Sequence, residues 1–419
     1  MLPQVLPKLR ADLDVMPSPS AEHPGLLLRD PFRYTETMLV IPPALVAALG
    51  WLDGERTRRE LAHLLSHQLG ENVPGELLSH LVGTLQSNGF LETEEYYRMR
   101  ERRHTEFRNL AERPAAHAGA AYPNQPAALR AEFNKYFQSA PARSTGDGLI
   151  GIAAPHVSPL GGWQSYAAAY AQLPAEPDHR TYVVLGTSHY GQPGRFGMTR
   201  KPFVTPYGTL PVDTRLVDWI AARSGDAVVM EDYCHSIEHS IEFQCVFLQH
   251  VLGTRVRILP ILCGSFIDSL LSGKPPESDP AVKRVLDTLA ELAEREGSRL
   301  FWVLGVDLAH IGRRYGDSFE VQAGQGRMEK LRQRDRERLD AYCRGDAEAF
   351  FDLVRPKQDE LRWCGYAPLY TFLKAVPAAR GSLLHYEQWN IDEQSVVSCA
   401  AIRFTGDGIQ ATETQRHGE

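Results

Sequence analysis

The sequence is poor in cysteine, with six among 419 residues, and no two of them form a Cys-x-x-Cys pair. No segment approaches the run of about 20 apolar residues that a membrane-spanning helix needs. The N-terminal residues lack the basic start, the long apolar stretch and the small-residue cleavage site of a secretory signal. These absences predict a cytoplasmic protein whose cysteines are thiols rather than disulfides.

An excess of positive charge is also missing. Lysine and arginine number 45 against 52 aspartates and glutamates, which gives a net charge of -7 and a pI near 6.1. Arginines cluster at residues 98–108, but glutamates are interleaved with them, which is typical of a solvated helix. Neither nucleic acid nor a membrane is therefore expected as a partner. The length favours two domains.

Residues 1–95 are expected to form a small module of their own. Strand-like runs precede three helical stretches, and a short extended piece follows. That order is typical of a small winged-helix-like α+β domain. The second helical stretch begins at Thr57 with Glu60 three residues on, which is a capping-box pattern. The strands are expected near residues 25–30, 35–41 and 90–92, and the helices at residues 43–49, 57–69 and 73–88.

A charged linker helix, residues 96–111, is expected between this module and a second domain, residues 112–406. In the second domain apolar strand-like runs alternate with helical patterns. The alternation predicts an α/β fold with a mostly parallel sheet sandwiched by helices. Residues 407–419 are polar and are expected to be disordered. Strands are expected near residues 149–154, 181–187, 255–263, 299–306 and 395–404, and helices near 163–173, 213–223, 240–252, 280–296, 326–344 and 366–375.

Short polar motifs close or follow several of these apolar runs. In an open α/β sheet, ligands bind in the crevice beyond the carboxyl ends of the strands, so motifs distant in sequence can converge there. Histidine, cysteine and carboxylate are side chains that bind a transition metal or move protons. The sequence therefore predicts a metal-type site. The motifs are Pro155-His156, Thr187-Ser188-His189, Glu238-His-Ser-Ile-Glu242, Asp307-Leu-Ala-His310 and Cys364-Gly-Tyr-Ala-Pro368.

Six motifs in order make the second domain similar to the Memo family, the AmmeMemoRadiSam system protein B group. The resemblance covers roughly residues 112–404. The motifs are Arg113-Pro-Ala-Ala-His-Ala-Gly119 with Tyr122-Pro123, Ala153-Ala-Pro-His156 with Gly161-Gly162, Leu185-Gly-Thr-Ser-His189, Glu238-His-Ser-Ile-Glu-Phe-Gln244, Asp307-Leu-Ala-His310 and Cys364-Gly365.

The resemblance implies a fold like that of the class III extradiol ring-cleaving dioxygenases. It also implies a metal site of two histidines and a cysteine with an aspartate nearby, here His156, His189, Cys364 and Asp307. Iron or copper is the expected metal, with zinc as a competitor. One departure lies beside the first ligand, where family members often have His-Ala-Gly-Tyr and this chain has His156-Val-Ser-Pro159.

The region of residues 25–91 resembles the PqqD-like, peptide-recognising winged-helix domains of radical-SAM maturation systems. That resemblance implies radical-SAM and AMMECR-type proteins as partners, with an unidentified small molecule or peptide as the ligand.

Each candidate ligand has a structural alternative. His156 and His189 could be satisfied by backbone carbonyls, although two histidines at neighbouring strand ends favour a shared site. Cys364 could be an ordinary buried thiol. Its position at the start of a helix is instead expected to lower the thiol pKa, and the thiolate is the form that binds metal. The other cysteines lack that context and are expected to be structural.

Further residues are expected around the ion. His239 lies between two carboxylates, which suits acid–base work, so His239, Glu242 and His310 are the expected catalytic residues. Asp307 is expected to bind the metal or orient a histidine. The alternative is that these residues only begin a helix or tie loops together. The expected pocket residues are Glu238, Tyr190, Trp363 and Gly365.

The leading functional hypothesis is a metal-dependent redox protein. Non-haem iron oxygenases use two histidines and one carboxylate, whereas a thiolate favours softer metals and is itself open to oxidation. Ring cleavage is therefore not expected from the fold alone. One alternative is a non-enzymatic module that binds a peptide or protein in the ancestral pocket. Another is a thiol- or metal-assisted enzyme in a radical-SAM-linked pathway.

Overall fold

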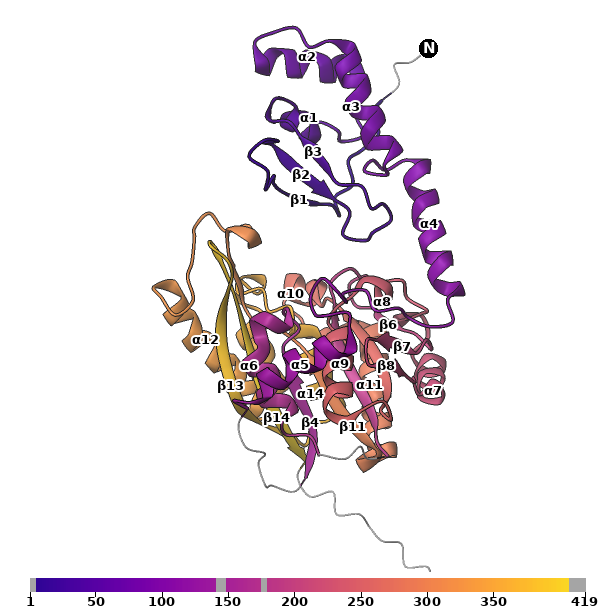
Figure 1. The fold of residues 1–419 in the computed structure, drawn as a ribbon, viewed down its shortest axis with the longest axis vertical. Coiled ribbons are helices and arrows are strands. Elements are labelled where there is room, and N and C mark those ends of the chain that lie inside the picture. The colour runs from indigo at the N-terminus through magenta and orange to yellow at the C-terminus, as the bar shows by residue number, and fades with distance from the viewer. Residues whose placement is uncertain (1–4, 141–147, 175–178, 407–419) are drawn as a thin grey trace, which may run out of the picture. The chain divides into compact units, whose positions relative to one another are not determined.

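The computed structural model describes residues 5–140, 148–174 and 179–406 of the chain. The tail expected at residues 407–419 lies outside the described residues. The chain divides into two compact units, Met1–Asn109 and Leu110–Glu419 (Figure 1). Each unit has its own cluster of buried apolar side chains.

The first unit joins a small antiparallel sheet to a set of helices. Its middle helix begins with a complete capping box, because Thr57 accepts from the backbone of Glu60 and Glu60 from the backbone of Thr57. The piece expected as a third strand forms only a bridge between Leu91 and Leu9. The elements are β1 (Asp14–Pro17), β2 (Leu26–Arg29), β3 (Leu39–Ile41), η1 (Pro43–Leu45), α1 (Val46–Gly50), α2 (Arg58–Leu69), α3 (Gly75–Ser87) and α4 (Glu94–Asn109).

Helix α4 covers most of the stretch expected to be a linker, and it contacts the rest of the first unit. The Tyr34 hydroxyl lies 3.1 Å from His104 Nε2. Arg103 Nε donates to the Arg33 carbonyl over 2.9 Å. The helix is therefore counted with the first unit, whose last residue is Asn109.

The second unit is built on a sheet whose four central strands are parallel, in the order β4-β11-β5-β10. Antiparallel strands flank them, with β14 beside β4 and β6 beside β10. The central strands are β4 (Leu149–Ala154), β5 (Thr181–Ser188), β10 (Arg257–Gly264) and β11 (Leu300–Gly305); the flanking ones are β6 (Phe196–Met198), β9 (Val228–Met230), β12 (His310–Gly312), β13 (Ala379–Asp392) and β14 (Ser395–Gly406), and β7 (Phe203–Thr205) and β8 (Gly208–Leu210) pair separately.

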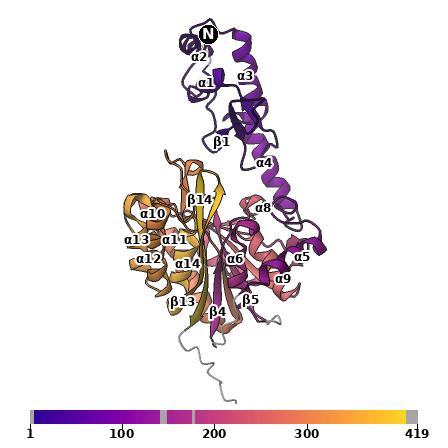
Figure 2. The ribbon, with the colours of Figure 1, turned by 60° about the vertical axis from the view of Figure 1, so that its left-hand side comes forward.

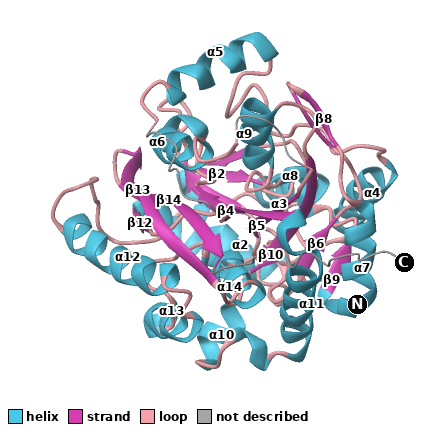
Figure 3. Cartoon of the chain, turned by 90° about the horizontal axis from the view of Figure 1, so that it is seen from below, coloured by secondary structure: helices cyan, strands magenta, loops and turns pink. Residues whose placement is uncertain are grey.

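Helices cover both faces of this sheet, as Figures 2 and 3 show. Helices α6 and α9 pack on β4 and β11 on one side, and α14 packs on β5, β10 and β11 on the other. The expected α/β class with a mostly parallel central sheet is confirmed. The helices are α5 (Pro126–Phe137), α6 (Pro159–Tyr170), α7 (Thr214–Ser224), α8 (Cys234–Ile237), α9 (Glu242–Leu252), α10 (Ile267–Ser272), α11 (Pro280–Glu296), α12 (Arg327–Cys343), α13 (Ala347–Val354) and α14 (Tyr366–Ala375), with short turns η2 (Gly225–Ala227), η3 (Pro276–Ser278), η4 (Gly297–Arg299), η5 (Arg313–Tyr315) and η6 (Pro356–Gln358).

The central strands form because their side chains are apolar on both faces. Every residue of β5 and of β11 is buried. Parallel strands covered on two sides have this composition. Among the described residues, none of the helices combines the length and the apolar character needed to cross a bilayer.

Two neighbouring central strands, β4 and β11, end at the same level, and β5 beside them runs two residues further. Gly305 of β11 pairs with Ala154 of β4 on one side and with Gly186 of β5 on the other. The loops that follow β4, β11 and β5 therefore start side by side, at the carboxyl edge of the sheet.

Candidate metal centre

The loops at this edge carry three of the expected ligands. His156 comes two residues after β4, Asp307 two residues after β11, and His189 directly after β5. Because β11 lies between the other two strands, the loop of Asp307 starts between those of His156 and His189. The sheet topology alone therefore brings residues 150 positions apart to one place.

Glycine at the strand ends lets a further segment approach. A Cβ on Gly305 would lie 2.2 Å from the Ser240 carbonyl oxygen, and one on Gly186 would lie 2.5 Å from Ser240 Oγ. The turn that leads into α9 thus presses directly on the strand ends. This contact places Glu238 and His239, which precede Ser240, beside the loops of His156 and His189.

His156 is oriented by the strand edge. Its side chain is 1% exposed, and its Nδ1 lies 2.9 Å from the Gly305 carbonyl. A carbonyl can only accept, so Nδ1 carries the proton and Nε2 keeps its lone pair. Nε2 lies 3.1 Å from Cys364 Sγ and 3.6 Å from Asp307 Oδ2. A histidine held in this way presents Nε2 as a ligand atom.

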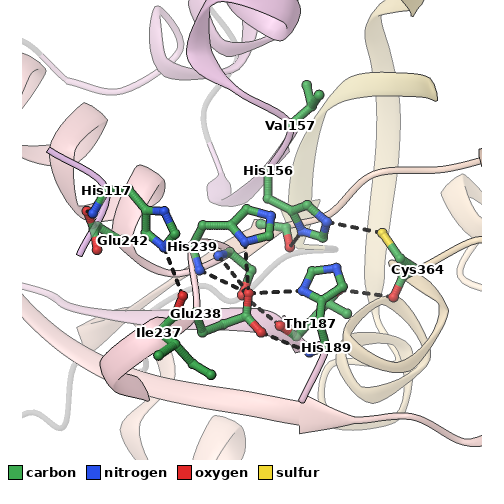
Figure 4. A network of polar contacts seen from close by, with 12 residues as sticks. His117, His156, Val157, Thr187, His189, Ile237, Glu238, His239, Glu242 and Cys364 are labelled. Carbon is green, nitrogen blue, oxygen red and sulfur yellow. Dashed lines mark hydrogen bonds and ion pairs between the residues drawn. The ribbon is translucent and has the colours of Figure 1, made fainter. Parts of the chain in front are cut away.

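One buried carboxylate, Glu238, orients the other two histidines. It accepts from the backbone N–H of His189 over 2.8 Å and from its Nδ1 over 2.9 Å. It also accepts from the backbone of His239 over 2.9 Å and lies 3.1 Å from His239 Nδ1 (Figure 4). Burial opposes a charge on Glu238, but the two histidines hold the pKa of its carboxyl well below the usual range. Within the part of the chain that the structure describes, no hydrogen bond engages Nε2 of His189 or His239.

The structure distributes the possible ligand atoms over two groups. In the first, ligand atoms of His156, His189 and His239 all lie within 4.8 Å of one another. In the second, those of His156, Asp307 and Cys364 do so. His156 belongs to both. The sequence-based prediction placed His189 and Cys364 in one ligand set with His156 and gave His239 an acid–base role. In the structure His239, rather than Cys364, shares a group with both His156 and His189.

The pKa of the Cys364 thiol is shifted in the direction opposite to the one expected from the sequence. Burial and the nearby Asp307 carboxylate raise the pKa of the Cys364 thiol well above its usual range. Its helix position does not lower it, because Cys364 is enclosed beside that carboxylate. Burial likewise raises the pKa of Asp307 to about 6, against the N–H groups of His156 and Val157 that favour its charged form. A bound cation would favour the deprotonated form of both groups.

Glu242, expected to act in proton transfer, has a structural position. It is fully buried and forms an ion pair with Arg113. It also accepts from the Tyr122 hydroxyl and from the backbone N–H of Ala116 and His117, the last two over 2.9 Å each. Both carboxylate oxygens are thus engaged in fixing residues 113–122. The contacts of Glu242 are thus structural ones, and its role in proton transfer stays a prediction.

His310 lies at the first residue of β12, outside both ligand groups. Its Nδ1 lies 3.0 Å from the Leu308 carbonyl and 3.1 Å from that of Arg362. Burial lowers its pKa to about 4. These two side-chain contacts tie loops together, which was the alternative to proton transfer, and neither joins His310 to Asp307.

Of the expected pocket residues, Tyr190 and Gly365 adjoin ligand residues, and Trp363 lines the cavity described below. Tyr190 has its ring centroid 6.2 Å from that of His189. Trp363 donates from Nε1 to Asp335 over 2.8 Å. Gly365 donates to the Asp307 carbonyl over 3.0 Å, and a Cβ there would lie 2.7 Å from that oxygen. The start of α14 is therefore fixed against the loop of Asp307.

A cavity of about 350 Å³ opens beside the centre, and the name inner cavity is used for it below. His189 and Cys364 line it together with Trp363, Phe266 and Leu270. Cys263 lines it as well, although the sequence gave that cysteine only a structural role. All six cysteines are free.

His117 was quoted from the sequence only as part of a motif. Its Nε2 lies 2.9 Å from the Ile237 carbonyl, and its ring centroid is 5.7 Å from that of His239. Figure 4 shows it as a fourth histidine beside the centre. The signal available in the sequence was a histidine four residues after Arg113, but the sequence does not show which segment the motif contacts. Gly161 and Gly162 serve packing, because Cβ atoms there would meet Trp389 and Val157.

We expect the buried His235 to make the protein sensitive to acid. It is 1% exposed, and burial lowers its pKa to about 4. The unfolded chain therefore binds the proton first, so the stabilisation is complete above pH about 6.5 and is lost as pH falls towards about 4. The loss is about 3 kcal/mol in the free energy of unfolding.

Urea unfolding of the metal-free protein between those pH values checks this expectation. His235→Gln should flatten the slope of the free energy of unfolding against pH. The exposed His179→Gln is the control and should keep the parental slope. An unchanged slope in His235→Gln would contradict the expectation.

Comparison with known proteins finds a matching family and several similar proteins. The family described as Memo-like protein matches residues 113–403. A MEMO1 family protein of Aquifex aeolicus (strain VF5) is 25% identical over 386 residues, which are 90% of this chain and 95% of that protein. One of Methanosarcina acetivorans is 30% identical over 296 residues, which are 69% of this chain and 98% of that protein. MEMO1 family protein TTHA0924 of Thermus thermophilus is 28% identical over 70% of this chain and 82% of its own length.

A solved structure, that of the uncharacterized protein JW3007 from Escherichia coli K12, covers 61% of this chain and 99% of its own. Its TM-score is 0.40 at 13% identity, a similarity too low to carry a conclusion. The Aquifex relative aligns with most of both units, whereas nearly all of the Methanosarcina relative aligns with 69% of the chain.

Proposed function

The chain belongs to the Memo family, and from that premise we propose that it binds a redox-active transition metal, iron or copper, at the centre formed by His156, His189, His239, Asp307 and Cys364. The observation that carries the proposal is the mutual distance of the ligand atoms, within 4.8 Å in each of two groups that share His156. Imidazole, thiolate and carboxylate together suit iron, copper or zinc. The six free thiols fit a reducing compartment such as the cytoplasm.

The residues around the ligands support the same proposal. Gly305 and Glu238 engage the Nδ1 atoms, which directs three Nε2 atoms towards the centre. Such outer contacts fix the tautomer and orientation of a metal-binding histidine. When bound, iron or copper would supply redox chemistry that the side chains lack. The chain's own part is to position the ligands and to hold a substrate in the inner cavity beside His189 and Cys364.

Metal analysis of protein purified without oxygen tests the proposal. We expect about one iron or copper ion per chain, and loss of that ion in a Cys364→Ala variant if the thiolate binds it. Cys263→Ala is the matched control, because Cys263 lines the same cavity outside both ligand groups. Protein that stays free of metal after loading with iron, copper and zinc would refute the proposal.

A second candidate function is the binding of a peptide by the first unit. Strand β3 pairs with β2 on one side only, and beside it lies a cavity of about 250 Å³ lined by Leu39, Ile41 and Leu45 and by Leu77, Leu81 and Leu85 of α3. An open strand edge next to apolar side chains suits an extended peptide. A peptide of a radical-SAM or AMMECR-type partner system is the expected ligand. Binding of such peptides to the full chain, lost in Val40→Pro, would support it.

A further inference from the structure

A second cavity, of about 630 Å³, adjoins the inner cavity and is called the outer cavity here. The two share three lining residues, Gln358, Asp359 and Arg362. All three belong to the short segment between α13 and α14, residues 355–365, which contains Cys364. One segment of chain therefore forms a wall of both cavities and leads directly to the metal centre.

The outer cavity is lined by more cations than anions. Five basic side chains face three acidic ones, Asp317, Asp359 and Glu360. The acidic groups already have partners of their own, as described below. The basic residues are Arg327, Lys330, Arg334, Lys357 and Arg362.

Each acidic group is engaged by a cation. Glu360 pairs with Arg334 at 2.6 Å and with Lys357 at 2.8 Å. Asp317 pairs with Arg362 at 2.8 Å.

The third acidic group is held from outside the cavity. Asp359 pairs with the buried Arg338 at 2.7 Å and accepts from the Trp363 backbone over 2.6 Å. Within the described residues, Arg327 and Lys330 then form no ion pair. The lining of the outer cavity thus has two cations without an ion pair on the first turn of α12, and of these Arg327 lies over the Phe319 ring with its Cζ 4.3 Å from the centroid.

The inner cavity has a different lining. Phe266, Ile267 and Leu270 give it an apolar wall. Its charged residues Asp359 and Arg362 are the two that are already paired. An apolar space next to the metal centre thus continues into a cationic space further out.

The wall between the cavities has an unusual backbone. Among the described residues, six other than glycine have positive φ, and four of them lie in this segment: Lys357 at 53°, Gln358 at 58°, Asp359 at 61° and Arg362 at 54°. Such conformations are strained for residues other than glycine and persist where the surroundings enforce them, often at ligand sites. The buried Arg338–Asp359 pair supplies that enforcement.

We propose that the site takes an amphiphilic anion, with its apolar body in the inner cavity and a carboxylate or phosphate in the outer cavity. Arg362 stands at the junction, and Arg327 and Lys330 supply the cations without an ion pair. Guanidinium and ammonium groups bind carboxylate and phosphate through charge-assisted hydrogen bonds. The inference rests on the proposed function, because it assigns the substrate of the same centre.

Binding of three probes to the full chain, by calorimetry, tests the inference: 4-phenylbutyrate, phenyl phosphate and the uncharged 4-phenylbutanamide. We expect at least one anion to bind about tenfold more tightly than the amide, and the better anion identifies the preferred head group. The double variant Arg327→Gln/Lys330→Gln should weaken anion binding about tenfold and leave amide binding unchanged. Added salt should weaken the anions selectively.

The matched control is Arg332→Gln/Arg336→Gln, which removes the same charge from exposed positions of α12 that do not line either cavity. It should keep anion affinity within about twofold. Equal weakening in both double variants, equal binding of amide and anions, or no anion binding at millimolar concentration would overturn the inference.

The measurements are made on metal-free and metal-loaded protein, with metal content determined in parallel. Anion binding that depends on Arg327 and Lys330 in a protein that never takes up metal would keep this inference and defeat the proposed function. Metal binding without any preference for the anions would keep the proposed function and defeat this inference.

Discussion

Replacing His156 by alanine is expected to abolish metal binding, with a loss of affinity of about a hundredfold or more. His156 is the one residue common to both ligand groups, so its removal leaves neither group with three ligands. Its ring is fixed by the Gly305 carbonyl, which lies 2.9 Å from Nδ1, and among the described residues no other imidazole contacts that oxygen. Metal content by mass spectrometry, with circular dichroism to show that the fold persists, measures the effect.

Three further variants make this result specific. His310→Gln is the control, because His310 is a half-buried histidine of the same edge that belongs to neither group, and it should keep the metal. His239→Ala and Cys364→Ala each disable one group only. Loss of metal in one of these two but not the other would assign the ion to the corresponding group. Full metal content in His156→Ala would contradict the proposed centre.

Replacing Arg113 by methionine is expected to lower the free energy of unfolding by about 3–5 kcal/mol, which is the usual cost of leaving a buried charge without its partner. Arg113 and Glu242 are both fully buried and form an ion pair. Arg113 also donates to the His235 carbonyl over 2.7 Å and to the Glu238 carbonyl over 2.8 Å. Urea unfolding of the metal-free protein measures the loss.

Two comparisons test whether the loss of stability comes from the buried unpaired charge. The double variant Arg113→Met/Glu242→Leu should recover part of the stability, because no unpaired charge is then buried. Arg200→Met removes one side of the exposed pair with Asp218 at 2.6 Å and should cost at most about 1 kcal/mol. A similar loss in Arg113→Met and Arg200→Met would show that burial of the pair does not matter.

The convergence of the polar motifs could be predicted because it depends on the sheet rather than on side chains. Apolar runs on both faces identify parallel strands, and parallel strands end at one edge. His156, His189 and Asp307 follow three such strands and do lie at that edge. The helices α11 and α14 were placed well for a similar reason, since their apolar periodicity is read within one segment.

What the sequence could not show are contacts between distant segments. Arg113 and Glu242 are 129 positions apart, and without that pair Glu242 looked like a catalytic carboxylate. His239 was placed correctly beside Glu238, but its inclusion with His156 and His189 depends on how the turn at Ser240 packs on Gly305. The pKa of Cys364 depends on Asp307, a neighbour that the helix position alone does not reveal. The long strand β13 escaped notice because its half-buried residues show no regular alternation.

The neighbouring carboxyl ends of β4, β11 and β5 have a consequence for how the protein selects an ion. Loops that start from rigid strands and are held by Gly305 and Glu238 lose their conformational entropy when the chain folds, not when the metal arrives. A site prepared in this way cannot rearrange to suit each ion in turn. Discrimination between metals then depends on how well an ion's preferred coordination geometry matches a fixed arrangement of nitrogen, sulfur and oxygen atoms.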